Sequence, residues 1–216
     1  MWRMLWLLLL VGSVPARAMS APALEEAVAS LAHRWDVIEY QTAKPEQEAA
    51  FTALAEQAHE LAAAEPRHAE PLVWEAIALC SEAGAKGGFG ALRLVKHARD
   101  LLLQAEHLDP NALDGSVYTT LGSLYYQVPG WPIGFGDKEK AADYLTKALA
   151  LNPDGLDPNY FYGDFLLKQG DKHAAIPVLE RALKAPPRPG REIADRGRRE
   201  EVRQLLAHTR AELASR

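Results

Sequence analysis

Apolar residues recur at spacings of three and four along most of this chain, the pattern of helices that bury one face. It is clearest in 141–153, AADYLTKALALNP, and in 175–187, AIPVLERALKAPP, where each apolar stripe ends at a proline. Proline cannot continue a helix and restricts the residue before it, so both segments predict helices that stop there. The pattern predicts an all-α protein.

These two helices are copies of one another, 34 residues apart. The matching residues are Ala141, Leu145, Ala148, Leu149 and Pro153 in the first copy and Ala175, Leu179, Ala182, Leu183 and Pro187 in the second. A third copy, ARDLLLQAEHLDP, covers 98–110 after a first helix at 71–83, and a fourth, degenerate copy ends at Pro66. A helix-turn-helix period of 34 residues is the signature of tetratricopeptide (TPR) repeats. We therefore expect a TPR-like right-handed solenoid of antiparallel helix pairs.

Small residues explain how the helices of one repeat can pack together. The repeated alanines fall on one helical face, where they let two antiparallel helices approach closely. Gly122 and Gly163 take equivalent places in the preceding helices. The dipeptide GD at 136–137 and again at 170–171 predicts a tight turn, because glycine can adopt positive φ and aspartate can cap the helix that follows.

The repeats divide the chain into four expected regions. These are a signal peptide at 1–18, a degenerate helical repeat at 19–66, three TPR-like repeats at 67–187 and a capping helix at 188–216. Two Gly-rich stretches interrupt the repeats, GAKGGFGAL at 84–92 and QVPGWPIGFGD at 127–137, and we expect inserted loops there. From Arg188 onward, eight arginines and five acidic residues accompany an apolar stripe. A helix of this kind can cover the end of the last repeat; an arginine cluster for an acidic partner is the alternative.

The N-terminal 18 residues have the composition of a secretory signal. Arg3 precedes the apolar run from Leu5 to Val14, and Ala16-Arg17-Ala18 supplies small residues where a signal peptidase cuts. The run is too short for a membrane span, although an uncleaved anchor is the alternative. We expect cleavage after Ala18 and a periplasmic or secreted protein without a stable membrane anchor. The lone cysteine, Cys80, lies far from this point and offers no site for acylation.

Composition excludes several classes of function. Without Arg3 and Arg17 of the signal peptide, 22 basic and 29 acidic side chains remain, a net charge of −7, which disfavours nucleic-acid binding. Cys80 sits in an apolar helix and is expected to be a buried, unreactive thiol. The histidines form no H-E-x-x-H or Cys-His pattern, and no G-x-S-x-G or phosphate-binding loop is present. We therefore expect no catalytic residues, no metal site and no cofactor, and we do not expect an enzyme.

Aromatic side chains are the candidates for binding. First helices of TPR repeats line the inner, concave surface, and insertions often form loops on the binding side. An aromatic groove there would suit an extended peptide or a small amphipathic molecule. The alternative is that these rings are ordinary core or fold back over the helix ends. The candidates are Trp74, Phe89, Tyr118, Tyr126, Trp131, Ile133, Phe135, Tyr160 and Phe165.

A family resemblance narrows these possibilities. Residues 70–187, and above all YYQVPGWPIGFGDKEKA and LNPDGLDPNYFYGDFL, resemble the bacterial TatT-type TPR component associated with TRAP (tripartite ATP-independent periplasmic) transporters. The resemblance implies a periplasmic helper that contacts a solute-binding protein and offers a hydrophobic ligand cleft. Members of that group can be lipid-anchored, whereas this chain has no cysteine at the cleavage point.

The leading hypothesis is a periplasmic adaptor or scaffold that binds a partner protein through an aromatic concave groove and the 127–137 loop. One form of this hypothesis makes the protein an accessory to a solute transporter, with a periplasmic solute-binding protein as the partner. A carrier of a small hydrophobic ligand and an envelope-assembly scaffold are the alternatives.

Overall fold

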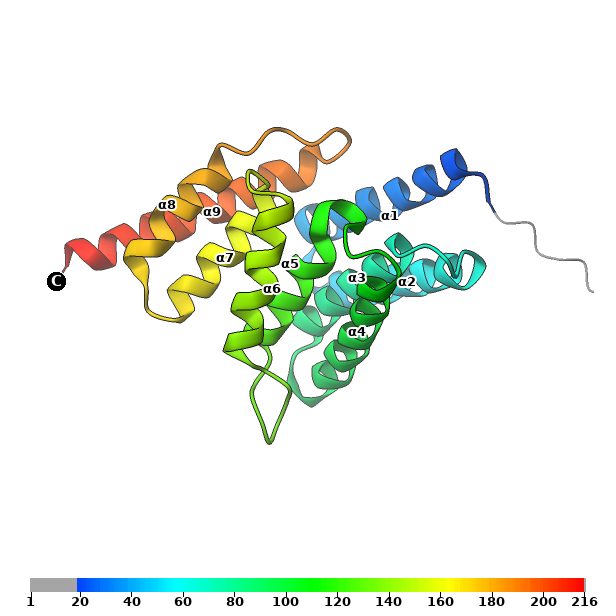
Figure 1. Ribbon diagram of the computed structural model, residues 1–216, viewed down its shortest axis with the longest axis horizontal. Helices are drawn as coiled ribbons and strands as arrows, with labels where there is room; N and C mark the ends of the chain where they lie inside the picture. Colours follow the sequence, from blue (N-terminus) through cyan, green and yellow to red (C-terminus); the bar gives the residue numbers. More distant parts are fainter. Residues whose placement is uncertain (1–18, 216) are drawn as a thin grey trace, which may run out of the picture.

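The computed structural model describes residues 19–215, which form nine helices (Figure 1). The expected signal peptide at 1–18 lies outside the described residues. The helices are α1 (Ala21–Gln41), α2 (Lys44–Ala64), α3 (Glu70–Lys86), α4 (Gly88–Leu108), α5 (Ala112–Gln127), α6 (Lys138–Leu151), α7 (Leu156–Lys168), α8 (Lys172–Leu183) and α9 (Glu192–Ala214). Within residues 19–215, none of them is long and apolar enough to cross a membrane.

Helix starts follow local chemistry. Proline occupies the first turn of α1, α2 and α3, where its missing N–H costs nothing. Asp137 caps α6 and Asp171 caps α8, each carboxylate accepting a hydrogen bond of 3.0 Å from the backbone three residues on. Both predicted caps are thus confirmed, and so is the tight turn at Gly170, which has positive φ. The tight turn predicted at Gly136 is wrong, because Gly136 lies at the end of an extended connection between α5 and α6 and does not have positive φ. Gly136 is needed for space, because a Cβ there would lie 2.0 Å from the carbonyl oxygen of Val128.

The helices pack as the expected pairs, α3 with α4, α5 with α6 and α7 with α8, which follow one another along the molecule (Figure 1). In each of the last two pairs a glycine on the first helix faces a buried leucine on the second. A Cβ at Gly122 would lie 2.6 Å from Cγ of Leu145, and one at Gly163 would lie at the same distance from Cγ of Leu179. Because Leu145 and Leu179 are 34 positions apart, the repeat seen in the sequence is a repeat of contacts. The fold is an all-α solenoid of helix pairs.

The expectation of an inserted loop at 84–92 is wrong. Helix α3 continues to Lys86 and α4 begins at Gly88, so Gly87 alone connects them. Gly87 and Gly88 both have φ near 65°. Two consecutive residues in this region, which glycine adopts without strain, reverse the chain within one residue. The glycine-rich stretch is a tight turn inside a helical hairpin and not an insertion.

An extended connection does occur between α5 and α6, where residues 128–137 project from the end of the pair (Figure 1). Its base is fixed by main-chain hydrogen bonds from Asp137 to Tyr125, at 2.8 Å, and from Gly136 to Pro129, at 3.0 Å. The bond between Trp131 and Pro132 is cis. We call residues 128–137 the α5–α6 loop.

Helix α9 covers the end of the solenoid and also reaches back to its beginning. Val202 and Leu206 are buried against α8, as a capping helix requires. Near its start, α9 also packs on α1, where a Cβ at Gly197 would lie 2.2 Å from the ring of Tyr40. The first and last helices of the described chain are therefore in contact.

Candidate functional site

Residues 184–191, between α8 and α9, form a C-terminal strap whose far end is held by α1. Arg191 makes a two-pronged ion pair with Asp36: Nη2 lies 2.7 Å from Oδ1, and Nε lies 3.0 Å from both carboxylate oxygens. Asp36 is fully buried. A buried carboxylate requires such a partner, so this pair fixes the strap on α1.

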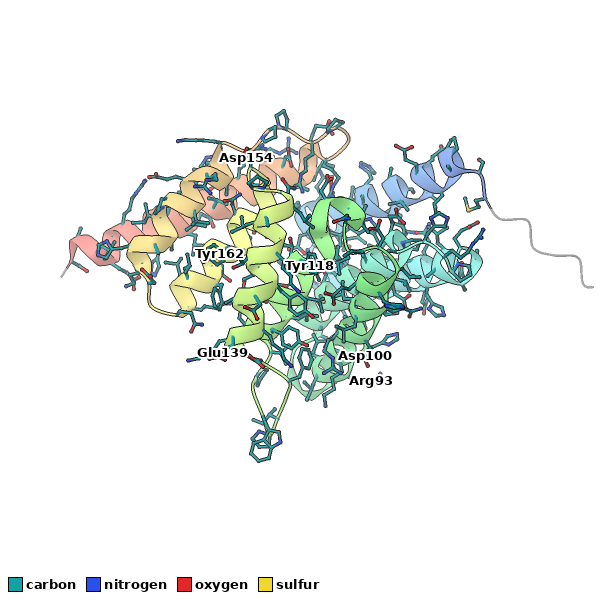
Figure 2. The ribbon with its side chains drawn as sticks, viewed as in Figure 1. Arg93, Asp100, Tyr118, Glu139, Asp154 and Tyr162 are labelled. Atoms are coloured by element: carbon teal, nitrogen blue, oxygen red, sulfur yellow. The ribbon has the colours of Figure 1, made fainter. Side chains whose placement is uncertain are left out.

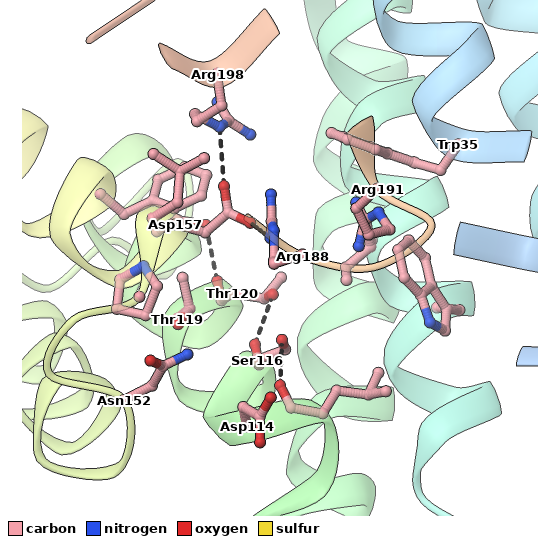
Figure 3. Close-up of a pocket in the computed structure, with 18 of the residues that line it drawn as sticks. Trp35, Asp114, Ser116, Thr119, Thr120, Asn152, Asp157, Arg188, Arg191 and Arg198 are labelled. Carbon is pink, nitrogen blue, oxygen red and sulfur yellow. Dashed lines mark hydrogen bonds and ion pairs between the residues drawn. The ribbon is translucent and has the colours of Figure 1, made fainter. Parts of the chain in front are cut away.

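Beneath the strap lies a cavity of about 420 Å³ enclosed by helices far apart in sequence (Figure 3). Helices α1, α3, α5 and α7 supply its walls, and the strap with α9 supplies its cover. We call it the concave cavity. It is lined by Trp35, Trp74, Ile77, Cys80, Ser81, Leu113, Asp114, Ser116, Thr119, Thr120, Ser123, Asn152, Gly155, Leu156, Asp157, Pro158, Phe161, Pro186, Arg188, Arg191 and Arg198.

Two arginines converge on Asp157 at the edge of this cavity (Figure 3). Nη1 of Arg188 donates to one carboxylate oxygen at 2.6 Å, and Nε of Arg198 donates to the other at 3.0 Å. Burial opposes the ionisation of Asp157, but the two guanidinium groups outweigh it and hold its pKa well below its usual range. The same carboxylate anchors the strap through Arg188 and α9 through Arg198.

Helix α5 presents a row of hydroxyl groups to the concave cavity. Ser116 donates to the carbonyl of Leu113 at 2.7 Å, Thr120 to that of Ser116 at 2.8 Å, and Ser123 to that of Thr120 at 2.9 Å. Because these protons are used within the helix, the hydroxyl oxygens are left to accept hydrogen bonds. This wall can receive donors from a bound molecule.

The beginning of α5 has a left-handed backbone. Leu113 and Asp114 have φ of 50° and 54°, followed by Gly115 at 80°. Residues other than glycine are strained in the left-handed region of φ and ψ. Such strain is often found at functional sites. The turn places Leu113 and Asp114 on the wall of the cavity.

Two tryptophans form the opposite, apolar wall. Nε1 of Trp35 donates to the hydroxyl of Ser81 at 2.9 Å, whereas the buried Nε1 of Trp74 has no hydrogen-bond partner among the described residues. The guanidinium of Arg191 lies over both rings, 6.0 Å from that of Trp35 and 5.2 Å from that of Trp74. These cation–π contacts hold the strap against the aromatic wall.

A second cavity of about 410 Å³ adjoins the first. Cys80 and Ser123 line both, so two small side chains separate them. The rest of its lining is largely apolar and comes from α3, α4, the end of α5 and the α5–α6 loop, including Leu92, Val95 and Ile133. Burial raises the pKa of the Cys80 thiol to about 12, so this thiol is protonated at neutral pH.

The α5–α6 loop sends its large side chains in different directions. Trp131 is 90% exposed and Ile133 is 61% exposed. Phe135 instead folds back, its ring 5.6 Å from that of Tyr125 and 4.6 Å from the guanidinium of Arg99. The loop therefore has an outward apolar tip on a base that is anchored by Phe135.

Most of the other aromatic candidates from the sequence lie between helices. Trp74 lines the concave cavity, and the side chain of Phe89 lies outside the described residues. Tyr118, which is labelled in Figure 2, stacks on Tyr144 of α6. Tyr126 of α5 and Phe165 of α7 pack on each other, and the hydroxyl of Tyr126 donates to Asp164 at 2.7 Å. Tyr160 packs on Phe161 of its own helix and under the guanidinium of Arg198 from α9.

The sequence does not reveal the residues that close the cavity. Arg188, Arg191 and Arg198 fit the sequence pattern of a solvated cap, because the partners that tie them to the rest of the fold, Asp36 and Asp157, lie far away in the chain. The sequence of α5 gives a weak indication of the cavity, because Thr119, Thr120 and Ser123 place polar side chains in a largely apolar stretch of this helix. Polar residues on the inner face of a first helix are unexpected unless that face lines a cavity.

His59 and His97 form a small polar cluster outside this cavity. Nδ1 of His59 lies 3.1 Å, and Nε2 of His97 3.6 Å, from the same oxygen of the buried Glu75. Within residues 19–215, no group of three or more histidine, cysteine or acidic side chains is arranged to hold a metal ion.

Comparisons with known proteins agree with this fold. Residues 133–208, from the α5–α6 loop into α9, match the model of the tetratricopeptide repeat family. The crystal structure of a thermophilic TPR protein from Thermus thermophilus superposes with a TM-score of 0.53, covering 84% of this chain and 92% of that one. The fold is that of a TPR solenoid. At 20% identity, the T. thermophilus TPR protein shows the fold alone. No curated protein matches the chain.

Proposed function

We propose that this protein is a periplasmic TPR protein that binds a small, partly apolar solute in the concave cavity, as an accessory to a solute transporter. The observation that carries the proposal is the strap. In an open TPR groove, the concave face is free to receive an extended peptide. Here, residues 184–191 and α9 cover that face and leave about 420 Å³ beneath them, which is the size of a small-molecule site.

The lining supports a ligand with an apolar body and a few polar groups. Trp35, Trp74 and Phe161 offer apolar surface, and the hydroxyl oxygens of α5 offer acceptors. Ligand sites are commonly apolar with a few well-placed polar groups. The resemblance to the TRAP-associated component supports the link to transport.

Binding, and not catalysis, suits the ionisable groups of this site. Asp157 has a lowered pKa and its two arginine partners have raised pKa values, so all three stay charged near neutral pH. A general acid or base instead needs a pKa near the working pH. These charges hold the cover in place and are not poised to transfer protons.

Native mass spectrometry of the protein purified from its own cell envelope tests this function. We expect a co-purified small molecule, and we expect the purified protein to bind anilinonaphthalene sulfonate, an amphipathic dye with an apolar aromatic body and an anionic sulfonate. Thr120→Trp would fill the concave cavity and should lower both by at least tenfold. Thr146→Trp is the matched control, because Thr146 is exposed on α6 and lies outside the cavity. Equal dye binding and ligand retention in both variants would refute the proposal.

A second candidate function is docking on a partner protein, such as a solute-binding or envelope-assembly protein, through the α5–α6 loop. The exposure of Trp131 favours it, because tryptophan ordinarily buries most of its surface and is enriched at the centre of protein interfaces. The anchored base reduces the conformational entropy that docking would cost. This function uses the outer tip and not the concave groove.

Crosslinking in the cell envelope separates this candidate from ligand binding. Trp131→Ala should abolish capture of a specific partner while leaving circular dichroism and ligand retention unchanged. Leu108→Ala removes a partly exposed apolar side chain of α4 and serves as the control. Capture that survives Trp131→Ala would argue against docking through the tip.

A further inference from the structure

Glu65 is a buried carboxylate at an unfavourable place in the fold. It directly follows α2 and is only 4% exposed. The end of a helix carries partial negative charge, so a carboxylate there is not stabilised by the helix. A buried carboxylate also loses its hydration and requires a cation in return.

The partner that the structure gives to this side chain is the main-chain nitrogen of Met19, which donates to Oε1 of Glu65. Met19 lies just before α1, whose start is thereby tied to the end of α2. As long as Met19 follows Ala18 in the chain, its nitrogen is an amide and carries no net charge. An amide satisfies a hydrogen bond but cannot neutralise a carboxylate.

We propose that Met19 is the N-terminus of the mature protein and that its α-ammonium group forms an ion pair with Glu65. The inference rests on the expected signal peptide and is independent of the proposed ligand function. A signal peptidase would add water across the Ala18–Met19 amide bond. The carbonyl carbon would take the hydroxyl group, and the nitrogen would leave with Met19 and become protonated at neutral pH. Cleavage would thus supply a positive charge, which no ion pair within residues 19–215 gives to Glu65.

In this arrangement Glu65 binds the charged N-terminus and does not merely fill space between α1 and α2. Removal of the leader would stabilise the junction between α1 and α2, because a charge-assisted hydrogen bond is stronger than a neutral one. The mature protein would be more stable than any form with a blocked or extended N-terminus. Glu65 would then be the binding partner of the N-terminus that cleavage creates.

Two measurements test the proposal. Intact mass spectrometry of the protein exported from cells that express the full chain should give the mass of residues 19–216. Thermal unfolding should then compare this protein with the same chain acetylated at Met19. Acetylation removes the charge, keeps one N–H donor and replaces the preceding peptide carbonyl with an acetyl carbonyl. It should lower Tm by about 4 °C for a chain of this size.

Variants at Glu65 identify the partner of the charge. In Glu65→Gln, acetylation should no longer change Tm, whereas Glu60→Gln, at an exposed position of α2, should keep the full effect. Where Glu65→Gln fails to fold, the α-amine of the unmodified protein should still react with an amine reagent at least tenfold more slowly than it does in urea. A different mature N-terminus, an equal effect of acetylation in both variants, or a fully reactive amine would overturn the proposal.

Discussion

Arg191 and Asp36 are 155 residues apart and form a two-pronged ion pair that fastens the C-terminal strap to the first helix. One side of the pair is fully buried and the other lies against two tryptophan rings. Together with the ion pairs that Asp157 makes to Arg188 and Arg198, this pair holds the cover of the concave cavity in place. The strength of the ion pair between Arg191 and Asp36 should therefore be measurable as a contribution to the free energy of unfolding.

Asp36→Ala should lower the free energy of unfolding by about 3 kcal/mol, because it leaves the guanidinium of Arg191 partly buried and unpaired. Urea denaturation measures this change. Glu200→Ala is the control: it removes an exposed ion pair with Arg203 and should cost about 0.5 kcal/mol or less. Similar losses in the two variants would mean that the strap is not held by Asp36.

Gly163→Ala should destabilise the protein by about 1 to 3 kcal/mol, because the added Cβ would lie 2.6 Å or less from two atoms of the buried Leu179. Gly84→Ala should act in the opposite direction. A Cβ there meets nothing within 4 Å, and alanine favours the helix by up to about 1 kcal/mol. Thermal unfolding of the two variants distinguishes crowding at the helix pair from a general effect of replacing glycine.

Asp157 should make stability depend on acid pH. Its pKa is lowered in the folded protein, so its ion pairs contribute stability above the unfolded pKa of about 3.9 and lose it as the pH falls toward the folded pKa. We expect unfolding free energy measured between about pH 5 and pH 2 to fall less steeply in Asp157→Asn than in the unmodified protein. Asp143→Asn, at an exposed site on α6, should keep the original slope.

Asp114→Gly should stabilise the protein by about 0.5 to 1 kcal/mol, because glycine adopts the left-handed backbone at this position without strain. The same change at Asp143, in the regular part of α6, should destabilise by about 0.5 kcal/mol. Urea denaturation compares the two variants. Loss of dye binding in Asp114→Gly, with stability gained, would show that the strain serves the cavity.

The helices and their pairing could be predicted because the repeat encodes local packing. Gly122 against Leu145 and Gly163 against Leu179 are contacts within one repeat, and both are visible as a 34-residue pattern. The glycine-rich stretch at 84–92 wrongly predicts a loop, because glycine permits a loop and a one-residue reversal equally well.

The candidate site could not be predicted in the same way. Its cover depends on pairs such as Arg188 with Asp157 and Arg191 with Asp36, which join different elements and leave no period in the sequence. Aromatic residues draw attention to the first helices, yet Tyr118 contacts Tyr144 on a neighbouring helix and Tyr126 contacts Asp164 on another. Burial depends on which face of a helix its neighbour covers, and the sequence alone does not give that.

Because α1 and α9 are in contact, this repeat protein differs from an open solenoid, whose two ends do not touch. An open solenoid is a modular array whose units can be added or deleted during evolution, since each unit touches only its neighbours. Here Gly197 sits against Tyr40 with no room even for a methyl group, so inserting a repeat would pull the two ends apart. The number of repeats is therefore a fixed property of this molecule, as the number of strands is in a closed barrel.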